Sequence, residues 1–180
     1  MKKFIPLIII IVLLIGLFQW GVGLNNTMVE KQQNAKKQWS NVESAYQRRA
    51  DLIPNLVNTV KGYASHEKET LEGVIQARAN ATKTTIDPTN VTPEQMAAFQ
   101  ESQNTLTGAL SRLMVVAERY PDLKANQNFL ELQSQLEGTE NRINVERNRY
   151  NEVATDYNIY VKKFPASLVA NILNFDPLVL

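Results

Sequence analysis

The sequence predicts an all-α protein, an antiparallel helical bundle behind an N-terminal transmembrane helix. Residues 4–24 contain no charged residue, and a run of this length can cross the hydrocarbon core of a bilayer as a helix. From residue 39 onward, apolar residues recur at alternating spacings of three and four, the pattern of helices that pack side by side. We therefore expect three long helices, the first kinked at Pro54, and a short C-terminal helix.

The N-terminal apolar segment is interpreted as a retained membrane anchor, residues 1–24, which a helical stalk, residues 25–38, joins to a bundle, residues 39–180. Trp20 lies near the far end of the segment, where an aromatic ring suits the membrane–water interface. A cleaved signal peptide is the alternative, because Gly21-Val22-Gly23 offers small residues for cleavage. We favour the anchor because the segment is longer than most signal-peptide cores and no alanine motif follows it.

The charges beside the span predict its orientation. Lys2 and Lys3 directly precede it and favour a cytoplasmic N-terminus, whereas Lys31, Lys36 and Lys37 lie further away on the other side. The expected location is the cytoplasmic (inner) membrane, with a single pass and with the bundle on the extracytoplasmic side, in a periplasm or at a cell surface. A signalling role would then need a separate membrane partner.

The first helical pattern begins at Trp39 and is expected to reach Ala81. Its phase does not slip between Ile53 and Leu56, which flank Pro54. A helix restarted at an arbitrary angle would not keep this register. Pro54 therefore kinks one continuous helix or sits in the first turn of its second half.

The later helices are bounded by turn and capping signals. Residues 81–92 are predicted to form a loop, and Thr92-Pro93-Glu94-Gln95 is a capping box that begins the second helix. The segment at residues 120–126 ends that helix, and Asn126 can cap the third, whose pattern runs from Phe129 to Phe164. Residues 166–175 predict a short apolar helix, which should pack back on the bundle or dock against a membrane or a partner.

Four polar residues occupy positions that apolar residues otherwise fill along these helices: Arg49, Glu67, Gln103 and Glu146. Burying an isolated charge costs on the order of several kcal/mol. Arg49, Glu67 and Glu146 must therefore be paired or reach solvent. Salt bridges that fix helix register are the preferred interpretation, and a polar site inside the bundle is the alternative.

Gly62 and Gly138 fall inside strongly patterned helical segments. Glycine costs about 1 kcal/mol relative to alanine in such positions. We expect both glycines to mark close approach between packed helices.

Composition argues against several classes of function. Lys plus Arg (19) and Asp plus Glu (18) nearly cancel, so no nucleic-acid partner is expected. The absence of cysteine excludes disulfides and thiolate chemistry. His66 is the only histidine, whereas a di-iron bundle site needs Glu-x-x-His twice. No nucleophile elbow or phosphate-binding loop occurs, so we predict no catalytic residue, no cofactor and no metal ligand.

Three stretches resemble the LemA family, and together they cover nearly everything after residue 35. They contain the runs DLIPNLV (51–57), YPDLKAN (120–126), TENRI (139–143) and FPASLVA (164–170). The resemblance implies a single N-terminal span followed by an antiparallel helical bundle. It also implies a bacterial envelope protein, and it carries over no catalytic residue, because no catalytic activity is established for the family.

The preferred function is a membrane-anchored, non-enzymatic interaction or scaffold protein of the cell envelope, with an envelope or membrane protein as its partner. One alternative is an extracytoplasmic ligand-binding sensor that acts through a separate membrane partner, and a buried polar cavity near Arg49 would favour it. The less favoured alternative is a carboxylate-dependent envelope hydrolase, whose signature would be two close carboxylates with raised pKa.

Overall fold

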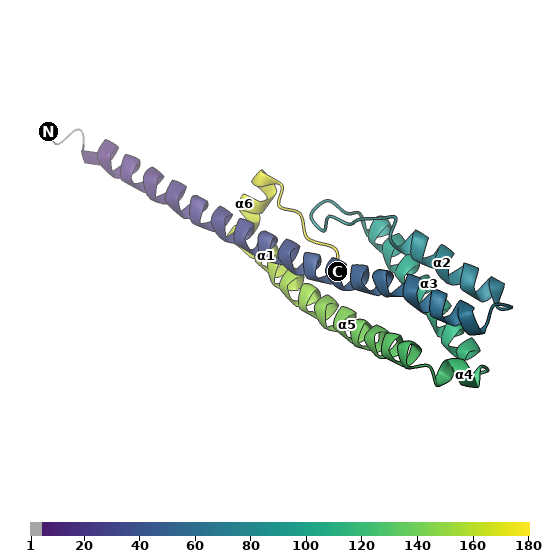
Figure 1. Ribbon diagram of the computed structural model, residues 1–180. Coiled ribbons are helices and arrows are strands. Elements are labelled where there is room, and N and C mark those ends of the chain that lie inside the picture. The colour runs from purple at the N-terminus through teal and green to yellow at the C-terminus, as the bar shows by residue number, and fades with distance from the viewer. Residues whose placement is uncertain (1–4) are drawn as a thin grey trace.

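Six helices and no strand make up residues 5–180, the part of the chain that this computed structural model describes (Figure 1). The all-α prediction is therefore confirmed. The helices are α1 (Ile5–Tyr63), α2 (Lys68–Ala81), α3 (Pro93–Ala117), α4 (Pro121–Lys124), α5 (Gln127–Lys162) and α6 (Ala166–Leu173).

The longest element, α1, runs without interruption from the apolar N-terminal segment into the bundle (Figure 1). Its 59 residues span about 90 Å at a rise of about 1.5 Å per residue. Its most apolar window has a mean hydropathy of 2.2 and is not buried at all, so α1 is long and apolar enough to cross a membrane. Lys2 and Lys3, on which the predicted orientation rests, lie outside the described residues.

The helix continues through Pro54, as the unbroken register predicted. The break comes ten residues later, since Ala64–Glu67 separate α1 from α2 where the pattern predicted one helix to Ala81. Tyr63 is 44% exposed, and Ala64 occupies the buried position in its place. This reversal lets α2 fold back beside the end of α1 (Figure 1).

The helices pack as two antiparallel pairs. α1 and α5 form the longer pair, α2 and α3 form the shorter one, and α4 turns the chain at the end farthest from the N-terminus (Figure 1). The direction of the chain alternates along α1, α2, α3 and α5, which is the up-down-up-down order of a four-helix bundle. The predicted antiparallel bundle is thus confirmed.

The predicted capping groups are confirmed. Thr92 Oγ1 accepts the Gln95 N–H at 3.2 Å, and Gln95 Oε1 accepts the Thr92 N–H at 3.0 Å. Asn126 Oδ1 accepts the Phe129 N–H at 3.0 Å at the start of α5. These bonds satisfy helix N-terminal donors that have no partner within the helix.

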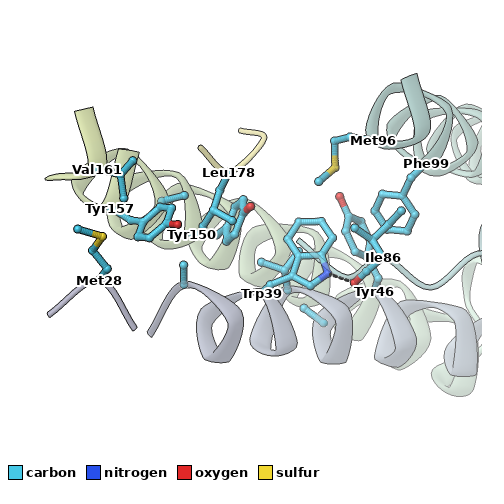
Figure 2. Close-up of a cluster of buried hydrophobic side chains, with 14 of the residues drawn as sticks. Met28, Trp39, Tyr46, Ile86, Met96, Phe99, Tyr150, Tyr157, Val161 and Leu178 are labelled. Atoms are coloured by element: carbon cyan, nitrogen blue, oxygen red, sulfur yellow. Dashed lines mark hydrogen bonds between the residues drawn. The ribbon is translucent and has the colours of Figure 1, made fainter. Parts of the chain in front are cut away.

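Aromatic side chains dominate the first of two buried clusters, which lies toward the apolar end of α1 (Figure 2). Trp39 packs against Tyr150 at 4.9 Å and Phe99 at 5.9 Å between ring centroids, and its Nε1–H donates to the Ile86 carbonyl at 2.9 Å. This bond ties the loop after α2 to α1. Within the predicted stalk, Met28 and Ala35 are also fully buried in this cluster.

The second buried cluster lies toward the α4 end of the bundle. It joins α1, α2, α3 and α5 and includes Ile53, Leu56, Val60, Leu71, Val74, Leu106, Leu113, Phe129 and Leu136. Every one of these residues lies on the predicted apolar face of its helix, so the spacing correctly selected the core.

The glycine prediction is wrong. A Cβ atom placed on Gly62 or Gly138 would meet no heavy atom within 4 Å. Neither glycine therefore permits a close approach of helices.

The C-terminal residues pack back on α5, as one of the predicted alternatives required. Asn158 makes two hydrogen bonds to the backbone of Leu178, at 2.7 and 2.8 Å, and Tyr150 Oη donates to the Val179 carbonyl at 2.7 Å. Leu178 itself is buried. Phe164, by contrast, continues the spacing of α5 but is 80% exposed, because the helix ends at Lys162.

Candidate functional site

The guanidinium of Arg49 is buried in the middle of the bundle, with 1% of the residue exposed. Nη1 donates to Glu140 Oε1 at 2.6 Å and to Thr107 Oγ1 at 2.9 Å, and Nη2 donates to Gln103 Oε1 at 2.7 Å. Three helices, α1, α3 and α5, therefore meet at one cation. We call Arg49, Gln103, Thr107 and Glu140 the polar layer.

Gln103 extends the polar layer to a fourth helix. Its Nε2 donates to the carbonyl of Ala81 at 2.9 Å, at the C-terminal end of α2. Carbonyls in the last turn of a helix lack an intrahelical donor, so this amide satisfies a group that would otherwise be buried unpaired. The side chain of Gln103 thus connects Arg49 with the end of α2.

The polar layer separates the two buried clusters. Along α1, Arg49 lies between Tyr46 of the first cluster and Ile53 of the second. Along α5, Glu140 lies in the same way between Ile143 and Leu136. If one helix slipped along another, the cation would face apolar side chains, which is the physical basis of register control by buried polar residues.

The two charged residues of the polar layer differ in their exposure to solvent. Arg49 is buried, whereas the side chain of Glu140 is 36% exposed and keeps contact with water. Tyr46 lies 5.3 Å from the Arg49 guanidinium, measured to its ring centroid, and burial raises the pKa of its hydroxyl. Arg49 Nε has no hydrogen-bond partner among the described residues.

Glu146 is buried in α5 and lies apart from the polar layer. It accepts hydrogen bonds from Gln38 Nε2 at 2.6 Å and from Arg149 Nη1 at 3.2 Å, and it forms a salt bridge with Arg142 Nε at 2.6 Å. Burial acts to raise the pKa of this carboxyl, but the Gln38 bond and the two arginine charges outweigh it and hold the pKa below its ordinary value. The charged form of Glu146 is therefore the stable one.

Glu67 occupies a third position, in the turn between α1 and α2. Its carboxylate accepts from Tyr120 Oη at 3.1 Å and pairs with Arg119 at 3.2 Å. The hydrogen bond to Glu67 is the main cause of the raised pKa of Tyr120. These contacts join the α1–α2 turn to the end of α3.

Of the four polar residues that the sequence selected, the structure brings together Arg49 and Gln103 and leaves Glu67 and Glu146 at separate sites. The sequence analysis missed Glu140, Thr107 and Gln38. All three lie beside the apolar faces of their helices, where a polar residue is ordinary, so the spacing gave no signal for them.

A polar hollow of about 600 Å³ opens next to the polar layer, between α1 and the loop after α2. Gln103 and Tyr46 line it at the end nearest Arg49, and Glu43 and Asp51 line it along α1. Hydroxyl groups of Ser44 and of the threonines after Ala81 complete its wall. The hollow has the size of a small-molecule site.

The carboxyl groups whose pKa is shifted are all stabilised in their charged form. Two hydrogen bonds from Thr89 and the charge of Lys36 lower the pKa of Asp87 to about 2. The pKa values of Glu94 and Glu146 are also lowered. A carboxylate-dependent hydrolase instead needs an acid with a raised pKa. Among residues 5–180, no group of three or more acidic or histidine side chains is placed to hold a metal ion.

The N-terminal apolar helix continues into an antiparallel bundle, and a buried polar layer crosses the middle of that bundle. These features define a membrane-associated helical-bundle protein. The chain belongs to the LemA family, whose model matches residues 38–179. The matched residues cover the bundle, and the apolar segment lies before them.

Two kinds of relative are similar to this chain. Protein LemA of Metamycoplasma hominis is 28% identical over 168 residues, which cover 93% of this chain and 73% of the relative. Magnetosome protein MamQ 2 of Paramagnetospirillum magneticum is 27% identical over 83% of this chain. Magnetosome protein MamQ of Magnetospirillum gryphiswaldense is 25% identical over the same share. The match spans 61% of the length of each of these two magnetosome proteins.

Proposed function

We propose that this protein is a non-enzymatic scaffold of the bacterial cell envelope, anchored in the cytoplasmic membrane by α1. The observation that carries the proposal is the continuity of α1, which supplies both the exposed apolar segment and the centre of the buried core. The helix runs unbroken through Gly21 and Gly23, the residues of the alternative cleavage site. A retained anchor therefore fits the fold better than a cleaved leader.

The interior of the bundle supports a structural rather than a catalytic role. Arg49, Gln103 and Glu146 are buried, and each is engaged by hydrogen bonds to other side chains of this chain. Groups engaged in this way hold helices together and do not present a reactive atom to a substrate. The relatives named Protein LemA and Magnetosome protein MamQ carry no enzyme name.

The bundle is proposed to lie outside the cytoplasm, and protease accessibility tests this. In intact cells or spheroplasts, an added protease should cleave the exposed loop at residues 82–85, while a cytoplasmic control protein stays intact. Cleavage only after lysis would place the bundle in the cytoplasm and refute this part of the proposal. The intact mass of the membrane-extracted protein should include the N-terminal segment, and a mass lacking it would refute the anchor.

The proposed partner is a membrane or envelope protein, and site-specific photocrosslinking tests it. A photoreactive residue would replace Val115 on α3, Val145 on α5 or Ile75 on α2, three exposed apolar positions on different helices. We expect a discrete crosslinked product from one of these surfaces. The buried position Ile53 is the matched control and should give none. No product from any exposed position in native membranes would contradict the scaffold role.

The polar hollow favours a ligand-binding sensor as a second candidate, because it adjoins the polar layer. A cavity near Arg49 is the feature that a sensor of this kind needs. Ser44 lines the hollow and is exposed, so Ser44→Trp should fill the space without disturbing the core. Native mass spectrometry of protein extracted from its own membranes should detect a bound small molecule that Ser44→Trp loses. The same bound mass on both proteins, or no bound mass on either, would refute this candidate.

A further inference from the structure

The outer side of α6 carries an apolar row that the bundle leaves uncovered. Leu168 and Ile172 lie one turn apart and are 55% and 76% exposed, and Phe164 precedes them in the turn between α5 and α6. The opposite side of the same helix is buried through Ala166 and Ala170. Single exposed apolar residues are common, but a row of them on a docked helix marks a contact surface.

This row lies close to the place where α1 leaves the bundle for its exposed apolar segment (Figure 1). Ala166 and Ala170 belong to the same buried cluster as Met28, and Leu24 packs against that cluster. Leu24 lies about 6 Å beyond Trp20 at a rise of about 1.5 Å per residue. The headgroup layer on each side of a bilayer is about 5–8 Å thick. If Trp20 marks the edge of the hydrocarbon core, α6 lies at the depth of the headgroups.

The charges beside α6 in the chain are mainly basic, with two lysines before the helix and Asp176 after it. The helix contains no charged residue. Lys162 is the last residue of α5 and Lys163 follows it, and both are exposed and form no salt bridge within residues 5–180. Basic residues beside an apolar helix face favour binding to a surface that contains anionic lipid.

We propose that α6 is an interfacial helix whose apolar row, Phe164, Leu168, Ile172 and Leu173, inserts into the surface of the bilayer that α1 crosses. Lys162 and Lys163 then lie among the anionic headgroups. This inference rests on the proposed membrane anchor and adds a second contact with the same membrane. Two contacts on different helices fix the angle at which the bundle stands on the bilayer, which one span alone does not.

The absence of cysteine makes single-site labelling of the full-length protein a direct test. Separate Ile172→Cys, Leu14→Cys and Val115→Cys variants would carry an environment-sensitive fluorophore in vesicles of phosphatidylcholine and phosphatidylglycerol. All three positions are exposed apolar residues, on α6, on the apolar part of α1 and on α3. We expect lipids brominated near the headgroup to quench the label at position 172, lipids brominated near the chain end to quench that at position 14, and neither to quench that at position 115.

The three labels separate the possible failures. Quenching at position 14 without quenching at position 172 would overturn the interfacial helix and leave the anchor intact. Absence of quenching at both positions would overturn the anchor, and the inference with it. A third outcome would also overturn the proposal. If the label at position 172 is protected from aqueous iodide but is not quenched by lipid, and if two copies crosslink, the row contacts a second copy of this chain.

The role of the lysines is tested in the labelled Ile172→Cys protein. Combined Lys162→Gln and Lys163→Gln changes should reduce quenching at position 172 in anionic vesicles and leave it unchanged in vesicles of phosphatidylcholine alone. Lys61→Gln with Lys83→Gln is the matched control, because both lysines are exposed and lie outside α6 and the end of α5. Equal quenching in all variants would overturn the headgroup contact of Lys162 and Lys163.

Discussion

Arg78 on α2 hydrogen-bonds to the backbone of Ala50 on α1, with its Nε at 2.7 Å from the Ala50 carbonyl oxygen. In an unbroken helix this carbonyl would accept the N–H of the residue four positions later, which here is Pro54. Proline has no N–H, so the carbonyl is left without a helical donor. Arg78 supplies the missing donor from the neighbouring helix, which explains how α1 tolerates a proline in its interior.

Arg78→Met should lower the free energy of unfolding by about 1–3 kcal/mol, because it leaves the carbonyl of the buried residue Ala50 without a donor. Chemical denaturation in detergent, followed by circular dichroism, measures this. Arg112→Met is the matched control, since Arg112 is exposed and makes no side-chain hydrogen bond among the described residues. In a Pro54→Ala background the loss should shrink, because alanine restores the helical N–H. Simple additivity of the two changes would refute the compensation.

Changes at two members of the polar layer should be non-additive. Gln103→Leu removes the partner of both Arg49 and the Ala81 carbonyl and should cost about 1–3 kcal/mol. Combining it with Arg49→Leu removes the buried cation as well, so the double change should cost less than the sum of the single changes. Denaturation midpoints of the four proteins test this. Asn104→Leu, at an exposed neighbouring position, should have little effect.

The contact of the loop after α2 should weaken in acid. The pKa of Asp87 is lowered from 3.8 to about 2, chiefly by the Thr89 hydroxyl and backbone N–H. A lowered pKa favours the folded state above pH 3.8, and that contribution is lost as the pH falls from 3.8 to about 2. Titration by NMR should give this value, and Thr89→Val should raise it. An Asp87→Asn variant should lose less stability over this range than the unmodified protein.

Gly138→Ala should stabilise the protein by up to about 1 kcal/mol, because the position is helical and open space surrounds the added methyl group. The gain from Gly62→Ala should be smaller, since Gly62 lies in the last turn of α1, where glycine is better tolerated. Thermal unfolding measures both changes. Destabilisation by Gly138→Ala would indicate a close contact at this surface.

The C-terminal residues should detach when Asn158 is replaced. The Leu178 N–H donates to Asn158 Oδ1 at 2.7 Å, so its exchange with solvent deuterium should be slow. Asn158→Ala should make this exchange fast while amides in α5 keep their protection. Asn151→Ala, one α5 position without a side-chain bond among the described residues, should leave the Leu178 amide protected. Equal protection in all three proteins would show that Asn158 does not hold the C-terminal residues.

Apolar spacing predicted most of the fold because it reports which side of a helix is buried. Trp39, Ile53 and Leu56 were placed correctly on α1 by this criterion. The end of α1 was missed because Leu71 and Val74 continue the spacing after the turn at residues 64–67. Gly62, one residue before the end of the helix, was the available signal, because glycine is common near helix C-termini.

The sequence predicted the buried charge of the candidate site but not the residues that pair with it. A charged residue on an apolar helix face, such as Arg49, can be recognised from the sequence, because a buried charge requires a partner. The identity of the partner depends on how helices distant in sequence are aligned, and Glu140 lies on α5 at a position with no distinguishing pattern. The same reason applies to Arg78, whose acceptor is a backbone carbonyl that any residue could provide.

The unbroken course of α1 couples the orientation of the bundle to that of the apolar segment. A helix advances about 100° per residue, so one residue inserted near Gly23 would turn the bundle by about that angle relative to the span. No flexible joint exists between them to absorb such a turn. A neighbouring helix that rotates the span within the bilayer would thus rotate every surface of the bundle by the same angle.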